Sequence, residues 1–288
     1  MKYSAFYLIV AGLALGAMLL PRTVLAEKKT PFIATETDKT QNFAWFTDTS
    51  GESAYVFDGS ATFDIESEES RVTGSGWYSM YAIVDLNTGA TTLWGKLHSE
   101  NTDGAWDGYW TGTEAGFSAT CVGSGDYEGL VSLWQCTPTS DVKGVYNWRG
   151  YIVENGQGEV PLKMSGWRTE QFVPLKLIEG NPVHVKACLD AGGGQASHIG
   201  VFTDLRKIGL VNLLDGIFSA TGTLRAANGD LLNWVTIGTM AGPPAVEVFF
   251  VGGTGRFEHA FGSFAGPLQY QSPELTSYTY KGTGKIRY

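Results

Sequence analysis

Tryptophans and ionisable side chains crowd one short stretch of this chain, and these residue types suit it for binding or proton transfer. In Trp106-Asp-Gly-Tyr-Trp110, strand alternation puts Trp106 and Trp110 on one face and Asp107 and Tyr109 on the other. A buried acid or tyrosine could protonate or orient a polyene or an epoxide. The candidate catalytic residues are therefore Glu100, Asp107 and Tyr109.

The tryptophans of the first half have two interpretations. Large side chains fill the interior of small β-barrels, so core packing is the first. Ligand contact is the second, because a cavity lined by rings would suit a hydrophobic or aromatic molecule, and an exposed row would suit the faces of sugars. The candidate ligand-binding residues are Trp94, Trp106, Trp110 and Trp134.

Sequence motifs of common catalytic and metal sites do not occur in the chain. There is no Gly-x-Ser-x-Gly, no His-Glu-x-x-His, no Cys-x-x-Cys and no EF-hand loop. The four histidines are spread along the sequence. We therefore expect neither a metal site nor a cofactor.

Strand signals recur along the chain, while helical periodicity is scarce. Segments such as 55–65, 76–84 and 91–98 alternate apolar and polar side chains between Gly, Asn, Asp or Ser, as antiparallel strands with one buried face do. Only segment 203–214 has leucines and isoleucine at loose helical spacing, which makes it the candidate helix or irregular crossover. The sequence therefore predicts an all-β fold.

Three short stretches recur in the same order in the second half of the chain. The pairs are Gly95-Lys-Leu-His-Ser-Glu-Asn-Thr-Asp103 with Gly222-Thr-Leu-Arg-Ala-Ala-Asn-Gly-Asp230, Gly125-Asp-Tyr-Glu128 with Gly255-Arg-Phe-Glu258, and Tyr146-Asn-Trp-Arg-Gly150 with Tyr278-Thr-Tyr-Lys-Gly282. The offset of roughly 130 residues is far longer than a solenoid repeat. It predicts two related antiparallel β-barrel-like halves in tandem, with Tyr127 and Phe257 plugging the barrel ends.

The predicted organisation has five parts. They are a signal peptide at 1–26, an N-terminal extension at 27–54, a first repeat at 55–153, a proline-containing linker at 154–182 and a second repeat at 183–288.

The first residues have the layout of a secretory signal peptide. A charged start is followed by an apolar run at 6–20 and a small-residue cleavage site ending at Ala26. The alternative is an uncleaved anchor helix, but the apolar run is nearer signal-peptide than membrane-span length. We expect a secreted or periplasmic protein without an integral membrane segment after cleavage, and we leave its oligomeric state open.

Charge argues against one class of partner. The net charge is −9 at pH 7, and cleavage would remove the positive residues Lys2 and Arg22. Binding to nucleic acid backbones requires clustered positive charge. No nucleic acid partner is therefore expected.

Three cysteines in an exported chain allow one disulfide. Cys121 and Cys136 flank the upstream glycine motif, so a hairpin through that motif would bring them face to face. We predict that these two pair and that Cys188 stays free.

The C-terminal glycine motif resembles part of a known family. Val251-Gly-Gly-Thr-Gly-Arg-Phe-Glu-His-Ala-Phe-Gly262, followed by Tyr278-Thr-Tyr-Lys-Gly-Thr-Gly-Lys-Ile286, resembles the closing strands of the allene oxide cyclase and dirigent β-barrel superfamily, over about the last third of the chain. The resemblance implies eight-stranded barrels with apolar interiors, which some members use to hold a reactive small molecule and steer its cyclisation or coupling. The preceding strands contain no match to the family's catalytic residues.

Three classes of function follow from these observations. The first, which we favour, is an exported barrel that binds a hydrophobic or aromatic small molecule, and the second is its catalytic version, a cofactor-free cyclase or isomerase. The third is a carbohydrate-interacting or structural extracytoplasmic module. An internal pocket with a buried carboxyl group or tyrosine favours the second class, a pocket without one the first, and a flat exposed aromatic strip the third.

Overall fold

The computed structural model describes the chain from residue 28 to the C-terminus, apart from a few short segments. The described residues are 28–48, 50–138, 142–154, 158–177, 182–212, 216–239, 245–271 and 277–288, with the side chains of 138, 172–177, 182–190, 206 and 207 left out. The predicted signal peptide at 1–26 lies outside them.

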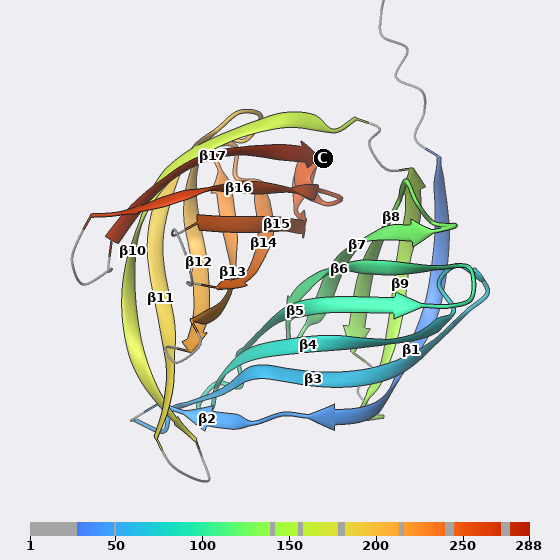
Figure 1. Cartoon of the computed structure of the whole chain (residues 1–288), viewed down its shortest axis with the longest axis horizontal. Helices are drawn as coiled ribbons and strands as arrows, with labels where there is room; N and C mark the ends of the chain where they lie inside the picture. Colours follow the sequence, from blue (N-terminus) through green and yellow to red (C-terminus); the bar gives the residue numbers. More distant parts are fainter. Residues whose placement is uncertain are drawn as a thin grey trace, which may run out of the picture.

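The first half closes into an eight-stranded antiparallel barrel, seen at the lower right in Figure 1. Closure results because β1 pairs with both β3 and β9. The strands are β1 (Lys29–Asn42), β3 (Ser53–Ser67), β4 (Gly74–Asp85), β5 (Thr91–Glu100), β6 (Gly104–Thr113), β7 (Gly116–Gly125), β8 (Leu130–Pro138) and β9 (Val145–Glu154).

The second half forms a second eight-stranded antiparallel barrel, closed by the pairing of β10 with β11 and β17 (Figure 1). Its elements are β10 (Val160–Leu177), β11 (Pro182–Ala196), β12 (Gly200–Asn212), β13 (Ile217–Ala226), β14 (Leu231–Thr239), β15 (Ala245–Gly253), the short 3-10 helix η1 (Gly255–Phe257), β16 (Phe261–Tyr270) and β17 (Ser277–Arg287). The predicted all-β fold with two related barrels in tandem is confirmed. In the part of the chain covered by the structure, no helix has the length and hydropathy of a membrane span.

A short strand joins the sheets of the two barrels. β2 (Trp45–Thr47) pairs with β3 of the first barrel, and its residues Phe46 and Thr47 pair with Leu177 and Lys176 of β10. The barrels are therefore linked by backbone pairing as well as by side chains.

The repeated glycine turns lie at corresponding places in the two barrels, between β7 and β8 and between β15 and β16. Tyr127 and Phe257 follow the glycines and are 3% and 0% exposed, each within the core of its own barrel. Both close a barrel end, as the repeat predicts. The Tyr127 ring also stacks on Trp106, with the ring centroids 5.2 Å apart.

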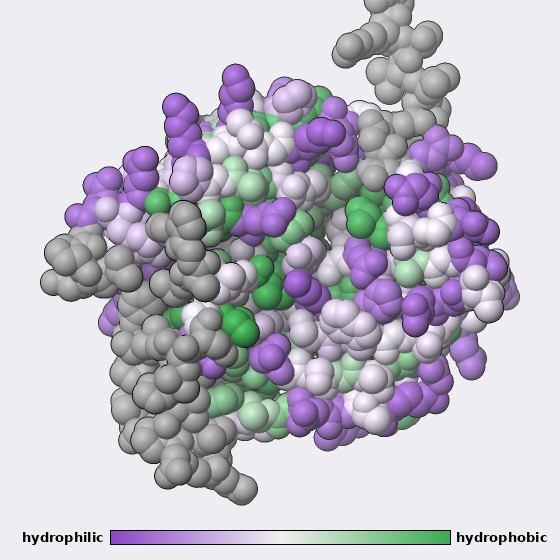
Figure 2. Space-filling view, in the orientation of Figure 1, coloured by the Kyte–Doolittle hydropathy of each residue, from purple (hydrophilic) through white to green (hydrophobic). Residues whose placement is uncertain are grey.

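Four hydrophobic clusters form the core of the described chain. One fills each barrel, and the third lies at the junction, where β5, β6 and β7 face β13, β14 and β15. A small fourth cluster joins Val131, Leu133 and Val153 of the first barrel to Phe261 of the second. The fully buried residues of the junction cluster are Phe46, Tyr55, Tyr81, Trp94, Leu210, Val235 and Val251. In Figure 2 the outward side chains are largely hydrophilic, and apolar side chains are seen toward the middle of this face.

Two boundaries and one element differ from the sequence-based prediction. The predicted N-terminal extension contributes β1, and the predicted linker contributes β10, because each strand completes the hydrogen bonding of its barrel. The predicted helix or crossover at 203–214 is wrong, since β12 runs through Asn212 and pairs with β11 and β13.

Candidate functional site

A buried carboxyl group lies inside the first barrel. Along β1, Phe32, Ala34 and Glu36 are buried in alternation with exposed residues, so all three point inward. Glu36 is 4% exposed. Its position results from strand periodicity, which places a glutamate where the core otherwise has apolar side chains.

The environment of Glu36 favours its neutral form. Burial raises its pKa from 4.5 to about 8, and the nearby Asp38 carboxyl raises it further, against the effect of one hydrogen bond. That bond is donated by the Trp148 indole Nε1 to Glu36 Oε2, at 2.9 Å. At neutral pH, Glu36 is therefore largely protonated and can donate a proton.

A second acid and two tyrosines lie beside Glu36. The Tyr78 hydroxyl donates to Asp38 Oδ2 at 3.2 Å, and Gln41 donates to the same oxygen at 2.7 Å. Burial outweighs these bonds and raises the Asp38 pKa. Burial likewise raises the pKa of Tyr146 to about 12 and raises that of Tyr78, so both phenols stay protonated.

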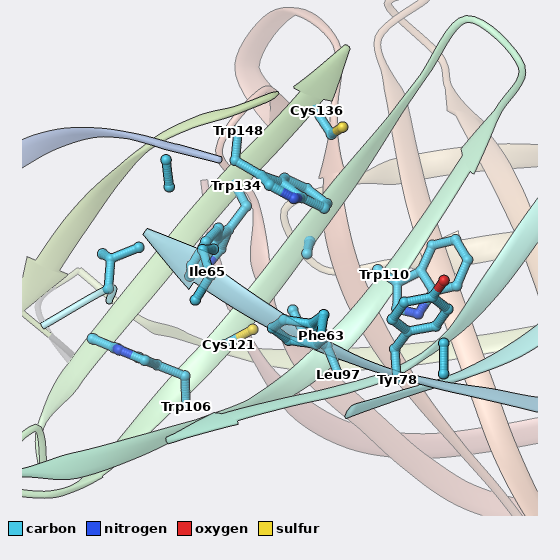
Figure 3. Packing of buried hydrophobic residues seen from close by; sticks show 14 of the residues in the cluster. Phe63, Ile65, Tyr78, Leu97, Trp106, Trp110, Cys121, Trp134, Cys136 and Trp148 are labelled. Carbon is cyan, nitrogen blue, oxygen red and sulfur yellow. The ribbon is translucent and has the colours of Figure 1, made fainter. Parts of the chain in front are cut away.

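A cavity of about 50 Å³ adjoins these groups. Its lining consists of Glu36, Tyr78, Met80, Leu93, Leu97, Trp110, Phe117, Tyr146 and Trp148. The volume fits one or two water molecules, at roughly 30 Å³ each, or one end of a larger ligand. Figure 3 shows Tyr78, Trp110 and Trp148 entering this interior from different strands.

The two ends of the first barrel are closed to different degrees. Val72, Trp106 and Tyr127 are fully buried at the end that carries the glycine turn. The rings of Phe117 and Tyr146, at the other end, are only partly buried. The cavity lies on the side of these partly buried rings.

The second barrel has a buried arginine–aspartate ion pair at interior positions that match those beside the cavity of the first barrel. In the first barrel Glu36 pairs with Tyr146, and in the second Arg168 pairs with Tyr278, the repeat counterpart of Tyr146. Arg168 therefore occupies the position of Glu36.

Three more interior positions match in the same way through the strand registers. They are Tyr78 with Asp204, Trp110 with Trp234, and Trp148 with Tyr280. Arg168 Nη1 lies 3.2 Å from Asp204 Oδ2, and both side chains are buried. The Arg168 guanidinium also lies 5.0 Å from the ring centre of Trp234 and 5.4 Å from that of Tyr280. Trp110 and Trp148 line the cavity of the first barrel, whereas the residues that match them in the second barrel contact Arg168.

No protein-family model, curated protein or solved structure matches this chain. The site is therefore interpreted from its own geometry. Among the described residues, no group of three or more His, Cys, Asp or Glu side chains is arranged to hold a metal ion.

Three of the four candidate ligand-binding tryptophans point into the first barrel. Trp106, Trp110 and Trp134 are 1%, 8% and 3% exposed, and all belong to its core. Trp110 lines the cavity. Trp106 lies near the closed end, donating its indole N–H to the Arg71 carbonyl at 2.7 Å.

Trp94 and Tyr109 lie on the outside of the first barrel, at the junction. Trp94 is fully buried there and donates its indole N–H to Ser219 Oγ of the second barrel at 2.7 Å. The ring of Tyr109 stacks on Phe249, with centroids 4.0 Å apart. Neither residue faces the cavity, because adjacent residues on a strand point to opposite faces.

The two acids among the candidate catalytic residues are exposed, so the burial expected of them is wrong. The side chains of Glu100 and Asp107 are 64% and 59% exposed on the outer face. Asp107 Oδ1 lies 2.8 Å from His98 Nδ1, and the His98 ring stacks on Trp77. A role for these acids in chemistry would require a site on the outer surface.

The predicted Cys121–Cys136 disulfide is absent, since both cysteines are free and buried. The register of β7 and β8 places Cys121 opposite Ser132 and Cys136 opposite Phe117. Four residues along a strand span about 13 Å, well beyond the reach of a disulfide. Figure 3 shows the two sulfur atoms apart. The side chain of Cys188 lies outside the described part of the structure.

Glu36, Asp38 and Tyr78 are the residues that sequence reasoning missed. The acids lie in the segment assigned to an extension, and Tyr78 was treated only as part of a strand. Alternation of Phe32, Ala34 and Glu36 against polar neighbours was the available signal.

Proposed function

We propose that the first barrel binds a hydrophobic or aromatic small molecule, one end of which contacts Glu36. The observation that carries this proposal is a difference between the two barrels at their matched interior positions. Arg168 contacts the rings of the second barrel, whereas the corresponding rings of the first barrel line a cavity beside a carboxyl group. An apolar pocket with a few convergent polar groups is the usual form of a ligand site.

The catalytic version of this function needs no cofactor. A Glu36 carboxyl with a pKa of about 8 could donate a proton to an epoxide oxygen or an alkene carbon and later recover one, which isomerises the substrate. The hydrogen-bonded pair of Tyr78 and Asp38 lies beside it. This chemistry is what the resemblance to the allene oxide cyclase and dirigent superfamily implies, and membership of that superfamily is part of the proposal.

Binding is tested with N-phenyl-1-naphthylamine, a neutral aromatic fluorophore, added to the chain that begins after residue 26. Leu97→Phe places extra volume in the cavity lining, and we expect it to weaken binding by tenfold or more. Leu224→Phe adds the same volume at the matching position of the second barrel and is expected to leave binding unchanged. Thermal unfolding checks that both variants fold, since overpacking costs about 1–3 kcal/mol.

The catalytic version is tested by incubating the protein with an apolar extract and following products by chromatography and mass spectrometry. We expect an isomer of unchanged mass that Glu36→Gln no longer forms.

Equal loss of dye binding in Leu97→Phe and Leu224→Phe would place the ligand elsewhere. Isomerisation that persists in Glu36→Gln would remove this residue from the chemistry.

A further inference from the structure

The outer face of the second barrel has a depression of about 790 Å³. It crosses five neighbouring strands, β12, β11, β10, β17 and β16. One row of paired residues runs across it, in the order Thr203, Gly193, Trp167, Thr279 and Gln269.

A second row lies beside the first and is mostly polar. It runs in the order Val201, Gln195, Ser165 and Lys281, each paired with the next. These residues are two positions from those of the first row on their strands, so both rows face outward.

A glycine forms part of the floor of this depression. The outside of a barrel is normally convex, so a hollow there requires missing side chains. Gly193, opposite Trp167, has none, and a Cβ atom at this position would lie 2.9 Å from the Phe202 carbonyl oxygen. Beside this floor, Trp167 is 53% exposed, and no other described aromatic ring stacks on it.

We propose that this depression binds a neutral oligosaccharide through Trp167. A pyranose ring presents an apolar C–H face, which stacks on an indole, and a rim of hydroxyl groups, which bind amide and hydroxyl side chains. Trp167 provides the indole, and Gln195, Gln269, Thr203 and Thr279 provide amides and hydroxyls around it. The volume falls within the range of roughly 300–1,000 Å³ found for ligand sites.

The chemistry of the lining disfavours other occupants. Among the described residues of the lining, Lys281 is the one that is charged, whereas a polyanion would require several cations. A purely apolar ligand would leave the glutamine and threonine side chains without partners. The site is separate from the interior of the first barrel, so either proposal can fail without the other.

The test is binding of the chain from residue 27 to a glycan array that includes cellohexaose, chitohexaose and mannohexaose, followed by calorimetry with the best ligand. We expect Trp167→Ala to weaken binding by about tenfold or more, because stacking residues dominate such sites. Gln195→Ala should weaken it less. Trp77→Ala is the matched control, since Trp77 is a 44% exposed tryptophan on the outside of the first barrel, and it should bind as the parent chain does.

Three outcomes would overturn the inference. The first is that the chain binds no neutral glycan on the array. The second is that Trp167→Ala and Trp77→Ala lose glycan affinity equally. The third is a concentration-dependent dimer, seen by light scattering, that Trp167→Ala abolishes, which would assign this face to a second copy of the chain.

Discussion

Glu36 and Arg168 occupy the same interior position in the two barrels, yet one is an acid and the other a base. In the second barrel, Asp204 lies 3.2 Å from the arginine and balances its charge. The matching residue in the first barrel is Tyr78, so Glu36 has a neutral phenol where Arg168 has a carboxylate. Burial, together with the nearby Asp38 carboxyl, keeps Glu36 in its protonated form.

The stability of the chain should therefore depend on pH through Glu36. Between its ordinary pKa of 4.5 and its folded-state pKa of about 8, the folded chain keeps a proton that the unfolded chain releases. The free energy of unfolding should fall with rising pH across this window, by about 1.4 kcal/mol per pH unit from this group, and level off above it. Urea unfolding from pH 4.5 to 9 measures the slope.

Glu36→Gln should remove most of that slope, because glutamine does not titrate. Glu100→Gln, which changes an exposed glutamate, is the control and should keep the parent slope. Identical slopes in all three proteins would show that Glu36 titrates normally in the folded state.

Arg168→Met should destabilise the second barrel. It removes the cation beside the buried Asp204 carboxylate, and loss of one partner from a buried ion pair costs about 3–5 kcal/mol. Denaturant unfolding at pH 7 checks this, with the exposed Arg225→Met as the control, expected within about 0.5 kcal/mol of the parent. A loss below 1 kcal/mol would contradict a buried ion pair at this position.

Cys121 and Cys136 should resist thiol reagents in the folded chain. Burial raises the pKa of Cys136 to about 12 and also raises that of Cys121, so neither forms the reactive thiolate. N-ethylmaleimide should label both only after unfolding in guanidinium without reductant, as read by peptide mass mapping. Recovery of a Cys121–Cys136 disulfide peptide from freshly purified protein would refute the observed register.

Gly255→Ala should cost more stability than Gly229→Ala. Both glycines have positive φ, +59° and +91°, which costs an alanine about 1–2 kcal/mol. A Cβ atom at Gly255 would also meet the Asp230 carboxylate, whereas Gly229 faces open space. Thermal unfolding should show a larger drop in melting temperature for Gly255→Ala than for Gly229→Ala. Equal drops would mean that the Asp230 side chain moves aside without cost.

The general fold could be predicted because repeats and alternation are local signals. The repeated glycine turns gave the duplication, and alternation in Trp106-Asp-Gly-Tyr-Trp110 gave the inward faces of both tryptophans. The strands that close the two barrels were harder to predict. β1 and β10 complete their barrels through partners more than a hundred residues away, for example Glu36 with Tyr146, and no local pattern reveals such pairing.

The site could be predicted only in part. Trp110 was found because it is large and inward. Glu36, which lines the same cavity, was not found, because alternation shows that it shares a face with Phe32 and Ala34 but not that this face closes into a barrel. Trp94 was misplaced for a related reason. Alternation shows that it faces away from Leu93 and Leu97, but not that a second barrel covers that face.

The junction between the barrels has the form of an isologous contact, because equivalent strands face one another, β5 to β7 on one side and β13 to β15 on the other. In a symmetric homodimer of single barrels, both sides would have to carry the same residue at each position. Covalent fusion removes that requirement, so Trp94 can stand on one side where its counterpart Thr221 stands on the other. The same freedom lets one barrel keep a protonated acid at its centre while the other holds a salt bridge.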